Sequence, residues 1–379
     1  MPTSTRWLAV VALLITVGAG FYGLTRSDPD HESQPGAVDW AAVLDEYSAD
    51  GFERPVGDWT LALPADHGAH DGAHAEFWNI SANLHDEDGK EVGVQFALQR
   101  FGLVPPRAPE RKSPWELRAL YRAHVILLDG DEGANRGEER FHRDVPGVAG
   151  HDEALEEVWL DDWTLRYGEG EAGTGVSVDA TVGRSELRLR LRPAKPAVGV
   201  NLGGNAAPFR GYSITRMIAE GTVGAGDDRR AVTGLAWLDH LWGDLPLPVG
   251  AIALDRLQLQ LRDGTDLSMT RMHRRDGRGT PTLTGYLVRA DGETEVIAGP
   301  SLEMELMRSW RDDASGARFP LEWRILASEL QLNVMPLVDD QLSDFVAPLW
   351  SGTVTGEGQL NGRPVSGLGT LVVSADAIK

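Results

Sequence analysis

The chain contains no cysteine in its 379 residues. Disulfide bonds, thiolate metal sites, a cysteine nucleophile and a lipid-modified N-terminal cysteine are therefore excluded. The sequence also has no Gly-x-Ser-x-Gly segment, the turn that presents the nucleophile of many serine hydrolases. Neither thiol chemistry nor this type of serine chemistry has support in the sequence.

Basic charge is scarce. Lysine and arginine number 36 against 57 aspartate and glutamate residues, which gives a formal net charge of −21. Such a field repels the phosphates of nucleic acids, so we expect no nucleic-acid partner.

A long hydrophobic run occurs at the N-terminus. Trp7–Leu24 carries no charged residue, Arg6 precedes it, and Arg26 and acidic residues follow it. This pattern predicts a signal peptide or membrane anchor over residues 1–29, with the rest of the chain outside the cytoplasm. Residues 30–50 are acidic and contain proline, which indicates a linker. We expect a periplasmic or extracytoplasmic protein tethered to the inner membrane.

Apolar residues recur with a period of two in several later segments, and 44 glycines serve the turns between them. The alternating segments are 92–100, 185–192, 255–262 and 330–334. Alternation places one side of a strand in a core, and the turn pairs Asp88-Gly89 and Asp263-Gly264 separate such strands. The sequence therefore predicts an all-β protein of antiparallel barrels or sandwiches.

The length of the chain favours two domains. Proline, glycine and asparagine cluster over Pro193–Gly211. We predict an N-terminal domain over residues 51–205 and a C-terminal domain over residues 206–379.

Five segments occur in an order that is typical of one protein family. They are Asp66–His70, Glu76–Trp78, Tyr212–Arg216, Gly234–Gly243 (Gly-Leu-Ala-Trp-Leu-Asp-His-Leu-Trp-Gly) and Asp255–Gly264. Together they resemble the AttH-like and carotenoid 1,2-hydratase-like family of tandem lipocalin-like domains. The resemblance implies two lipocalin-like β-barrels after the N-terminal hydrophobic helix, a hydrophobic ligand such as a lipid or isoprenoid, and no cofactor. It also implies a permease of a lipoprotein-export-type ABC transporter as a partner.

The sequence departs from the family pattern at several aromatic and acidic positions. These positions hold Phe77, Asn79, Leu241, Leu254, Arg256, Ser351 and the segment Leu368–Val372. Their loss favours binding over catalysis.

The resemblance also places the candidate site residues. If strands 232–239 and 254–261 pair in a hairpin, Asp239, His240, Trp242 and Asp255 meet at one barrel end. There His240 or a carboxyl of raised pKa could protonate a double bond, and Trp242 could shield the resulting cation. The alternative is a structural corner that closes the hairpin.

Ligand contacts are assigned to the family segments as well. We assign them to Glu76, Trp78, Tyr212 and Trp237.

Three histidines lie close together in one segment of the sequence. His67, His70 and His74 have the chemistry of zinc ligands, but spacing alone does not make them converge. We expect them to make loop hydrogen bonds and expect no metal site.

Two functions remain open from the sequence. The first is an exported lipocalin-like protein that binds or handles a hydrophobic ligand. The second is a hydratase, cyclase or hydrolase that acts on a hydrophobic substrate through His240 and Asp255. The departures from the family pattern favour the first.

Overall fold

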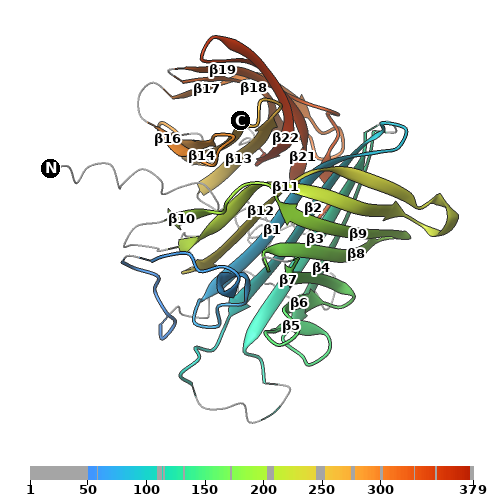
Figure 1. The fold of residues 1–379 in the computed structure, drawn as a ribbon, viewed down its shortest axis with the longest axis vertical. Coiled ribbons are helices and arrows are strands. Elements are labelled where there is room, and N and C mark those ends of the chain that lie inside the picture. Colours follow the sequence, from blue (N-terminus) through green and yellow to red (C-terminus); the bar gives the residue numbers. More distant parts are fainter. Residues whose placement is uncertain are drawn as a thin grey trace.

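The computed structural model describes residues 50–57, 59–108, 113, 116–130, 133–170, 173–202, 209–244, 252–274, 278–298, 302–327, 329–345 and 348–375. The Trp7–Leu24 segment and residues 30–49 of the predicted linker lie outside this part of the chain. None of the helices within it is long and apolar enough to span a membrane. Besides strands it contains two short 3-10 turns, η1 (Ala65–His67) and η2 (Gly226–Asp228). The predicted all-β class is confirmed (Figure 1).

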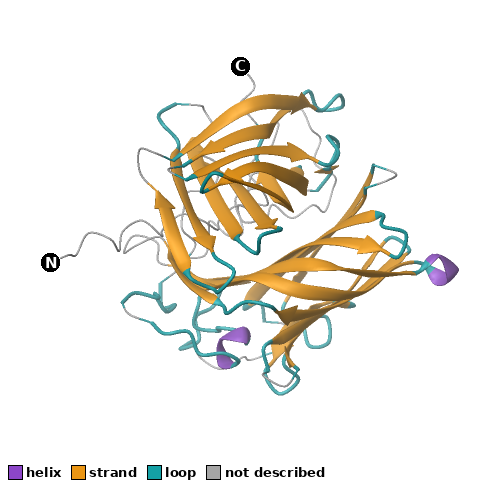
Figure 2. Cartoon of the chain, turned by 45° about the horizontal axis from the view of Figure 1, so that its top comes forward, coloured by secondary structure: helices purple, strands orange, loops and turns teal. Residues whose placement is uncertain are grey.

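The first sheet curls around its own core and is antiparallel throughout (Figure 2). Its strand order is β4 (Ala134–Arg143), β3 (Ala119–Asp129), β2 (Glu91–Gly102), β1 (Ala75–Asp86), β12 (Arg230–Gly243), β11 (Phe209–Gly224), β9 (Ser185–Pro193), β8 (Gly175–Val182), β7 (Trp163–Glu169), β6 (Glu157–Leu160) and β5 (Ala149–Asp152). Strand β10 (Val198–Leu202) pairs with β11 outside this path.

The second sheet forms another near-barrel. Its order is β16 (Thr294–Ala298), β15 (Thr282–Val288), β14 (Asp266–Arg274), β13 (Ile252–Leu261), β22 (Arg363–Val373), β21 (Leu349–Leu360), β19 (Leu330–Pro336), β18 (Arg318–Leu326) and β17 (Glu303–Arg311), with β20 (Leu342–Ser343) on β21. The four alternating sequence segments coincide with β2, β9, β13 and β19, so these strand predictions are confirmed.

Alternation gives each strand an inner and an outer face. On β1, Trp78, Ile80 and Leu84 point into the core of the first barrel, as does Leu238 on β12. On β13, Leu257 and its alternate neighbours point into the core of the second barrel. The outer faces of β1, β11 and β12 meet the outer face of β13, where polar side chains join the two sheets.

The change of sheet lies later in the chain than predicted. Strands β11 and β12 run from Phe209 to Gly243 and occupy the middle of the first sheet, between β9 and β1. The division at residues 205 and 206 would remove these two strands from the sheet that contains their partners. The first sheet therefore extends to Gly243, and the second begins at Ile252.

The hairpin predicted between residues 232–239 and 254–261 is not formed. Strand β12 pairs with β1 and β11, whereas β13 pairs with β14 and β22. The prediction failed because adjacent alternating segments can enter different sheets, and the sequence pattern is the same in both cases.

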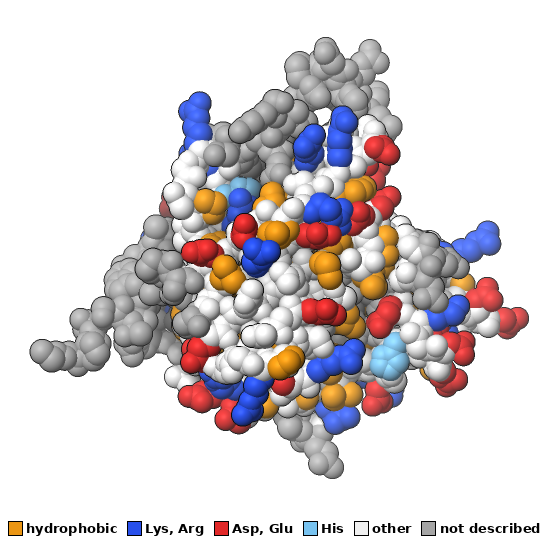
Figure 3. All heavy atoms as spheres, turned by 90° about the horizontal axis from the view of Figure 1, so that it is seen from above, with side chains coloured by type: hydrophobic (Ala, Val, Ile, Leu, Met, Phe, Trp, Pro, Cys, Tyr) orange, Lys and Arg blue, Asp and Glu red, His pale blue; other side chains and the backbone are white. Residues whose placement is uncertain are grey.

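The surface above the second barrel carries both signs of charge. Figure 3 shows the face at the top of Figure 1, where acidic and basic side chains are interspersed with single hydrophobic ones. Leu306, Met307 and Met335 are among the exposed hydrophobic side chains of the described chain. The net negative charge therefore does not gather into one continuous acidic patch on this face.

Candidate functional site at the end of the first barrel

His240 lies inside one end of the first barrel, on the face of β12 that also carries Trp242. Its Nε2 is 2.9 Å from Oε1 of Glu76, and its Nδ1 is 3.0 Å from the backbone oxygen of Asp66. The ring stacks on Trp78, with centroids 4.8 Å apart. Because a carbonyl oxygen only accepts, Nδ1 is the donor in its hydrogen bond. The tautomer of His240 is thus set by the loop that carries Asp66.

Glu76 is the carboxylate around which the site is organised. It lies opposite Trp242 in the pairing of β1 with β12 and is fully buried. Its Oε1 accepts hydrogen bonds from Nδ1 of His70 at 2.9 Å and from the backbone N–H of His70 at 2.9 Å. Burial alone would raise the pKa of Glu76, but the hydrogen bonds from His240 and His70 outweigh it and hold the pKa below its usual value. Glu76 is therefore ionised at neutral pH.

The loop after η1 closes this end of the barrel. A side-chain oxygen of Asp66 accepts a hydrogen bond from the backbone N–H of Ala62 at 2.7 Å, which fixes the turn. His70 then lies flat on Trp242, with ring centroids 3.6 Å apart and planes 6° from parallel. The His70 side chain is 23% exposed, whereas those of Glu76 and His240 are 0% exposed. His70 is the member of the site that solvent reaches.

A second polar chain supports the site from β2, β3 and β5. Arg100 donates a hydrogen bond to Asp71 at 2.7 Å and lies 3.8 Å from Glu76. His151 lies 3.3 Å from Asp71 through Nε2 and 3.3 Å from the hydroxyl of Tyr121 through Nδ1. The hydrogen bond from His151, aided by the charge of Arg100, lowers the pKa of Asp71 to about 2. The site thus contains two ionised carboxylates next to one buried arginine.

His67 and Tyr212 form a third pair on the same side of the barrel. Nδ1 of His67 lies 2.5 Å from the hydroxyl of Tyr212. Burial and the nearby His240 lower the pKa of His67 to about 4, and burial raises that of Tyr212 well above its ordinary value. Both groups are therefore uncharged at neutral pH. Nε2 of His67 and Nε1 of Trp78 are buried without a hydrogen-bond partner, so two polar atoms remain for a bound molecule or water.

Comparison with known proteins identifies the family to which this fold belongs. A sequence model of the AttH-like family matches residues 54–369. The chain belongs to the AttH-like family. A search of curated proteins found no match.

Solved structures share the fold of this AttH-like chain. The crystal structure of an AttH protein from Nitrosomonas europaea superposes with a TM-score of 0.71 at 25% identity, covering 85% of this chain and 99% of that one. Kievitone hydratase from Nectria haematococca gives a TM-score of 0.61 at 15% identity and covers 87% of this chain and 98% of its own. The second similarity shows the fold alone.

Eight residues of the segments that resemble the family pattern meet at the end of the first barrel. They are Asp66, His67, His70, Glu76, Trp78, Tyr212, His240 and Trp242. Trp237 and Asp239 of the same segments point to the opposite face of β12, as do Phe77, Asn79 and Leu241, which depart from the pattern. Leu241 therefore removes no group from the surroundings of His240, because neighbouring residues of a strand face opposite ways.

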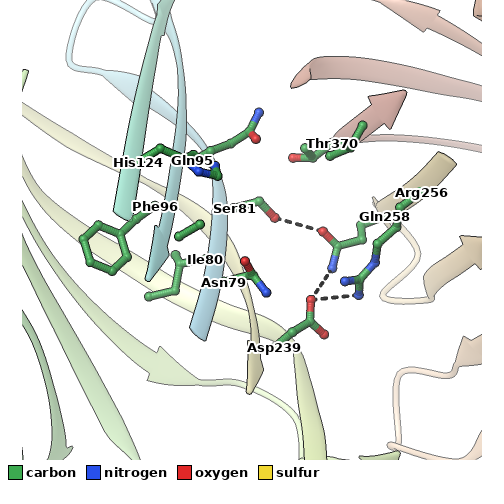
Figure 4. Close-up of a pocket in the computed structure, with 12 residues that line it drawn as sticks. Asn79, Ile80, Ser81, Gln95, Phe96, His124, Asp239, Arg256, Gln258 and Thr370 are labelled. Atoms are coloured by element: carbon green, nitrogen blue, oxygen red, sulfur yellow. Dashed lines mark hydrogen bonds and ion pairs between the residues drawn. The ribbon is translucent and has the colours of Figure 1, made fainter. Parts of the chain in front are cut away.

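A small cavity between the two barrels gathers other changed positions. Its volume is about 40 Å³, and its lining includes Asn79, Arg256, Thr370 and Val372 (Figure 4). Asp239 faces this cavity and bonds Gln258 at 2.9 Å and Arg256 at 2.7 Å. The cavity has room for a few water molecules and none for a lipid.

The four predicted catalytic residues do not form one site. His240 and Trp242 are at the barrel end, but Asp239 points out of the barrel toward Arg256, because Asp239 and His240 are neighbours on one strand. Asp255 faces the interior of the second barrel, where it bonds Arg271 at 2.5 Å and the backbone N–H of Ser374 at 3.1 Å. The prediction that these four residues converge is wrong.

Three of the four predicted ligand contacts do come together. Glu76, Trp78 and Tyr212 surround His240. Trp237 lies on the outer face, where its indole N–H donates to Asp239 at 3.0 Å.

Sequence reasoning missed four members of the site. They are Arg100, Tyr121, His151 and Asp71. Strand parity could have identified Arg100, because it continues the inward series of Phe96 and Leu98. Tyr121 and His151 depend on strand pairing that the sequence does not display, and Asp71 depends on the path of the loop before β1.

Proposed function

We propose that this chain catalyses the addition of water to a carbon–carbon double bond of a hydrophobic small molecule, or the reverse reaction, at the end of the first barrel. The observation that carries the proposal is the position of His240. Its Nδ1 faces a backbone oxygen and its Nε2 faces a carboxylate oxygen, both within 3.0 Å. Because both oxygens accept, the 2.9 Å contact between Nε2 and Oε1 of Glu76 requires a proton on one of the two atoms. Burial lowers the pKa of His240, although the hydrogen bond and the charge of Glu76 oppose this shift, so an imidazolium formed here gives up its proton readily and the pair can act as a buried general acid.

The chemistry balances with the groups at this site. The proton of the Glu76–His240 pair adds to one carbon of the double bond, and a water oxygen bonds to the other carbon. The surplus proton of that water returns to the pair. Trp78 and Trp242 stack on His240 and His70, so the pair is bordered by aromatic rings, which stabilise a nearby carbocation. The unpartnered Nε2 of His67 is available to hold the water or a polar group of the substrate.

Kievitone hydratase shares the fold of this chain and is a hydratase by name, which supports this class of reaction. Asp255 has no part in the proposed reaction, because Arg271 and Ser374 occupy its carboxylate. The reaction centre therefore consists of His240 and Glu76 and excludes the second barrel.

A binding protein for a hydrophobic ligand is the second candidate function. The departures from the family pattern at acidic and aromatic positions favour it, because groups of a catalytic site are absent there. In that case we also propose export, a tether through Trp7–Leu24 and an ABC transporter permease as partner. A reporter fused after Lys379 and active only in the cytoplasm would contradict the proposed export.

The test uses the full chain in mild detergent with a panel of isoprenoid alkenes in oxygen-labelled water. We expect label in an alcohol product and a fall in turnover of about 100-fold or more for His240→Ala and Glu76→Gln. Asp255→Asn is the control, since it changes a buried carboxylate remote from the proposed centre, and it should keep turnover per folded molecule. Equal turnover of the His240→Ala variant and the wild-type protein would exclude this site. Unchanged alkene recovered in a stable complex would favour the binding function.

A further inference from the structure

Three side chains at the end of the first barrel have the donor set of a metal site. Nδ1 of His70, Nε2 of His240 and a carboxylate oxygen of Glu76 all lie within 4.8 Å of one another. Within the part of the chain that the structure describes, no other group of three histidine or acidic side chains converges in this way. Two imidazoles and one carboxylate are the ligands of many catalytic zinc sites.

We propose that His70, Glu76 and His240 bind one divalent cation of the zinc class and leave a fourth position open. The proposal relies on the proposed function for the location of the reaction centre, not for the reaction. The metal takes the place of the proton between Nε2 of His240 and Oε1 of Glu76. A water in the fourth position would then supply both the oxygen and the proton for hydration.

The geometry requires only a small adjustment. The two nitrogen atoms are each 2.9 Å from Oε1 of Glu76. Zinc–ligand bonds of about 2.0–2.2 Å in a tetrahedron place neighbouring ligand atoms roughly 3.3 Å apart. Each nitrogen therefore needs to move about 0.4 Å away from Oε1, which requires small shifts of the Glu76 carboxylate and of both imidazoles.

The surroundings orient both imidazoles as metal sites require. Nδ1 of His240 donates to the backbone oxygen of Asp66 at 3.0 Å, which turns the lone pair of Nε2 toward Glu76. Nε2 of His70 lies 3.6 Å from the carboxylate of the same Asp66, beyond hydrogen-bond distance, and this negative charge favours a proton on Nε2, which leaves Nδ1 to bind a metal. Hydrogen bonds from the far nitrogen to a carbonyl or carboxylate are the usual outer partners of metal-binding histidines. One residue thus orients both ligands.

The other two histidines of this segment have different positions. His67 is directed to Tyr212, and the ring of His74 packs 5.0 Å from that of Phe52. The proposed site is therefore distinct from a three-histidine cluster in the loop. It combines one loop histidine with residues of β1 and β12.

The test begins with the full chain purified without chelators or a histidine tag. Its metal content is measured by mass spectrometry, the metal is removed with EDTA, and zinc uptake by the apoprotein is titrated against a coloured chelator. We expect one equivalent of zinc to bind, and cobalt to give the visible spectrum of a four-coordinate site. His240→Ala and Glu76→Gln should lose this binding. His85→Ala changes an exposed histidine of the same strand and should keep it.

Circular dichroism and melting temperature establish that each variant is folded, and Glu76→Gln preserves the shape of the side chain. Asp66→Asn provides a graded test, with an affinity about 10–100-fold lower because the negative charge next to Nε2 of His70 is removed. An apoprotein that takes up no zinc, or equal uptake by the wild type and folded Glu76→Gln, would overturn the site. Hydration by metal-free protein would contradict a role of the metal in the reaction and leave the proposed function in place. Stoichiometric metal binding without any hydration would support the metal site and contradict the proposed function.

Discussion

At the scale of single residues, the end of the first barrel combines burial with charge. His67 is 2% exposed and stays neutral, beside His240, which contacts the ionised Glu76. A site of this kind contributes to stability in a manner that depends on pH, because its groups titrate differently in the unfolded chain.

His67 gives the first prediction at this scale. Its pKa of about 4 in the folded protein lies below its ordinary value of 6.5, so the unfolded chain binds the extra proton first as pH falls. Its stabilisation is complete above pH 6.5 and is lost as pH falls toward 4. The loss is up to about 3 kcal/mol, since one pKa unit corresponds to about 1.4 kcal/mol. Urea unfolding of wild type and His67→Gln between pH 7 and 4 measures it, and the variant should show a flatter slope. Identical slopes would contradict the assignment.

At the scale of elements, strand type and turn position were predictable, and the assembly of the site was not. In β2, β9, β13 and β19 the alternating apolar residues of the sequence are those that face the cores. The site depends instead on which strands are neighbours. Glu76 reaches His240 because β1 pairs with β12, at a separation of 164 residues. The family motifs located most residues of the site, and the alternation of β12 separates Asp239 from His240, because neighbours on a strand face opposite ways.

Asp266 at the start of β14 joins the two sheets and gives the prediction at this scale. It is fully buried and accepts hydrogen bonds or ion pairs from Lys195 at 2.7 Å, Thr215 at 2.8 Å and Arg216 at 2.6 Å. Replacement by asparagine leaves the buried Lys195 without its counter-charge. We expect Asp266→Asn to cost about 3–5 kcal/mol in the free energy of unfolding.

Chemical denaturation with a matched variant measures this cost. Asp263→Asn changes an exposed carboxylate in the adjacent turn and should cost less than about 1 kcal/mol. Replacing Asp266 and Lys195 together should lower the free energy of unfolding by less than the sum of the two single replacements, because each single replacement leaves the other residue without its partner. Additive effects would show that the ion pair does not join the sheets.

At the scale of the whole molecule, the two barrels share a polar boundary. Gln258 and Gln260 of β13 reach Asp239 and the backbone oxygens of Thr215 and Ala236 on the first sheet. Buried hydrogen bonds of this kind specify one relative orientation, because each unpaired group would lose its solvation without replacement. The cavity shown in Figure 4 lies within this boundary and is too small for the hydrophobic ligands considered above.

The position of the sheet change gives the last prediction. A fragment of residues 50–205 lacks β11 and β12, which lie between β9 and β1, so it leaves two strand edges unpaired and the core open. A fragment of residues 50–244 contains all strands of the first sheet, together with Tyr212, His240 and Trp242. We expect the longer fragment to show cooperative thermal unfolding and dispersed amide resonances, and the shorter one to aggregate. Polar Ser81, Ser213 and Asp239 on the exposed boundary of the longer fragment keep that face compatible with water, since these side chains can exchange their partners for solvent. Cooperative unfolding of the shorter fragment would show that its strands close without β11 and β12, and would restore the division near Pro193–Gly211.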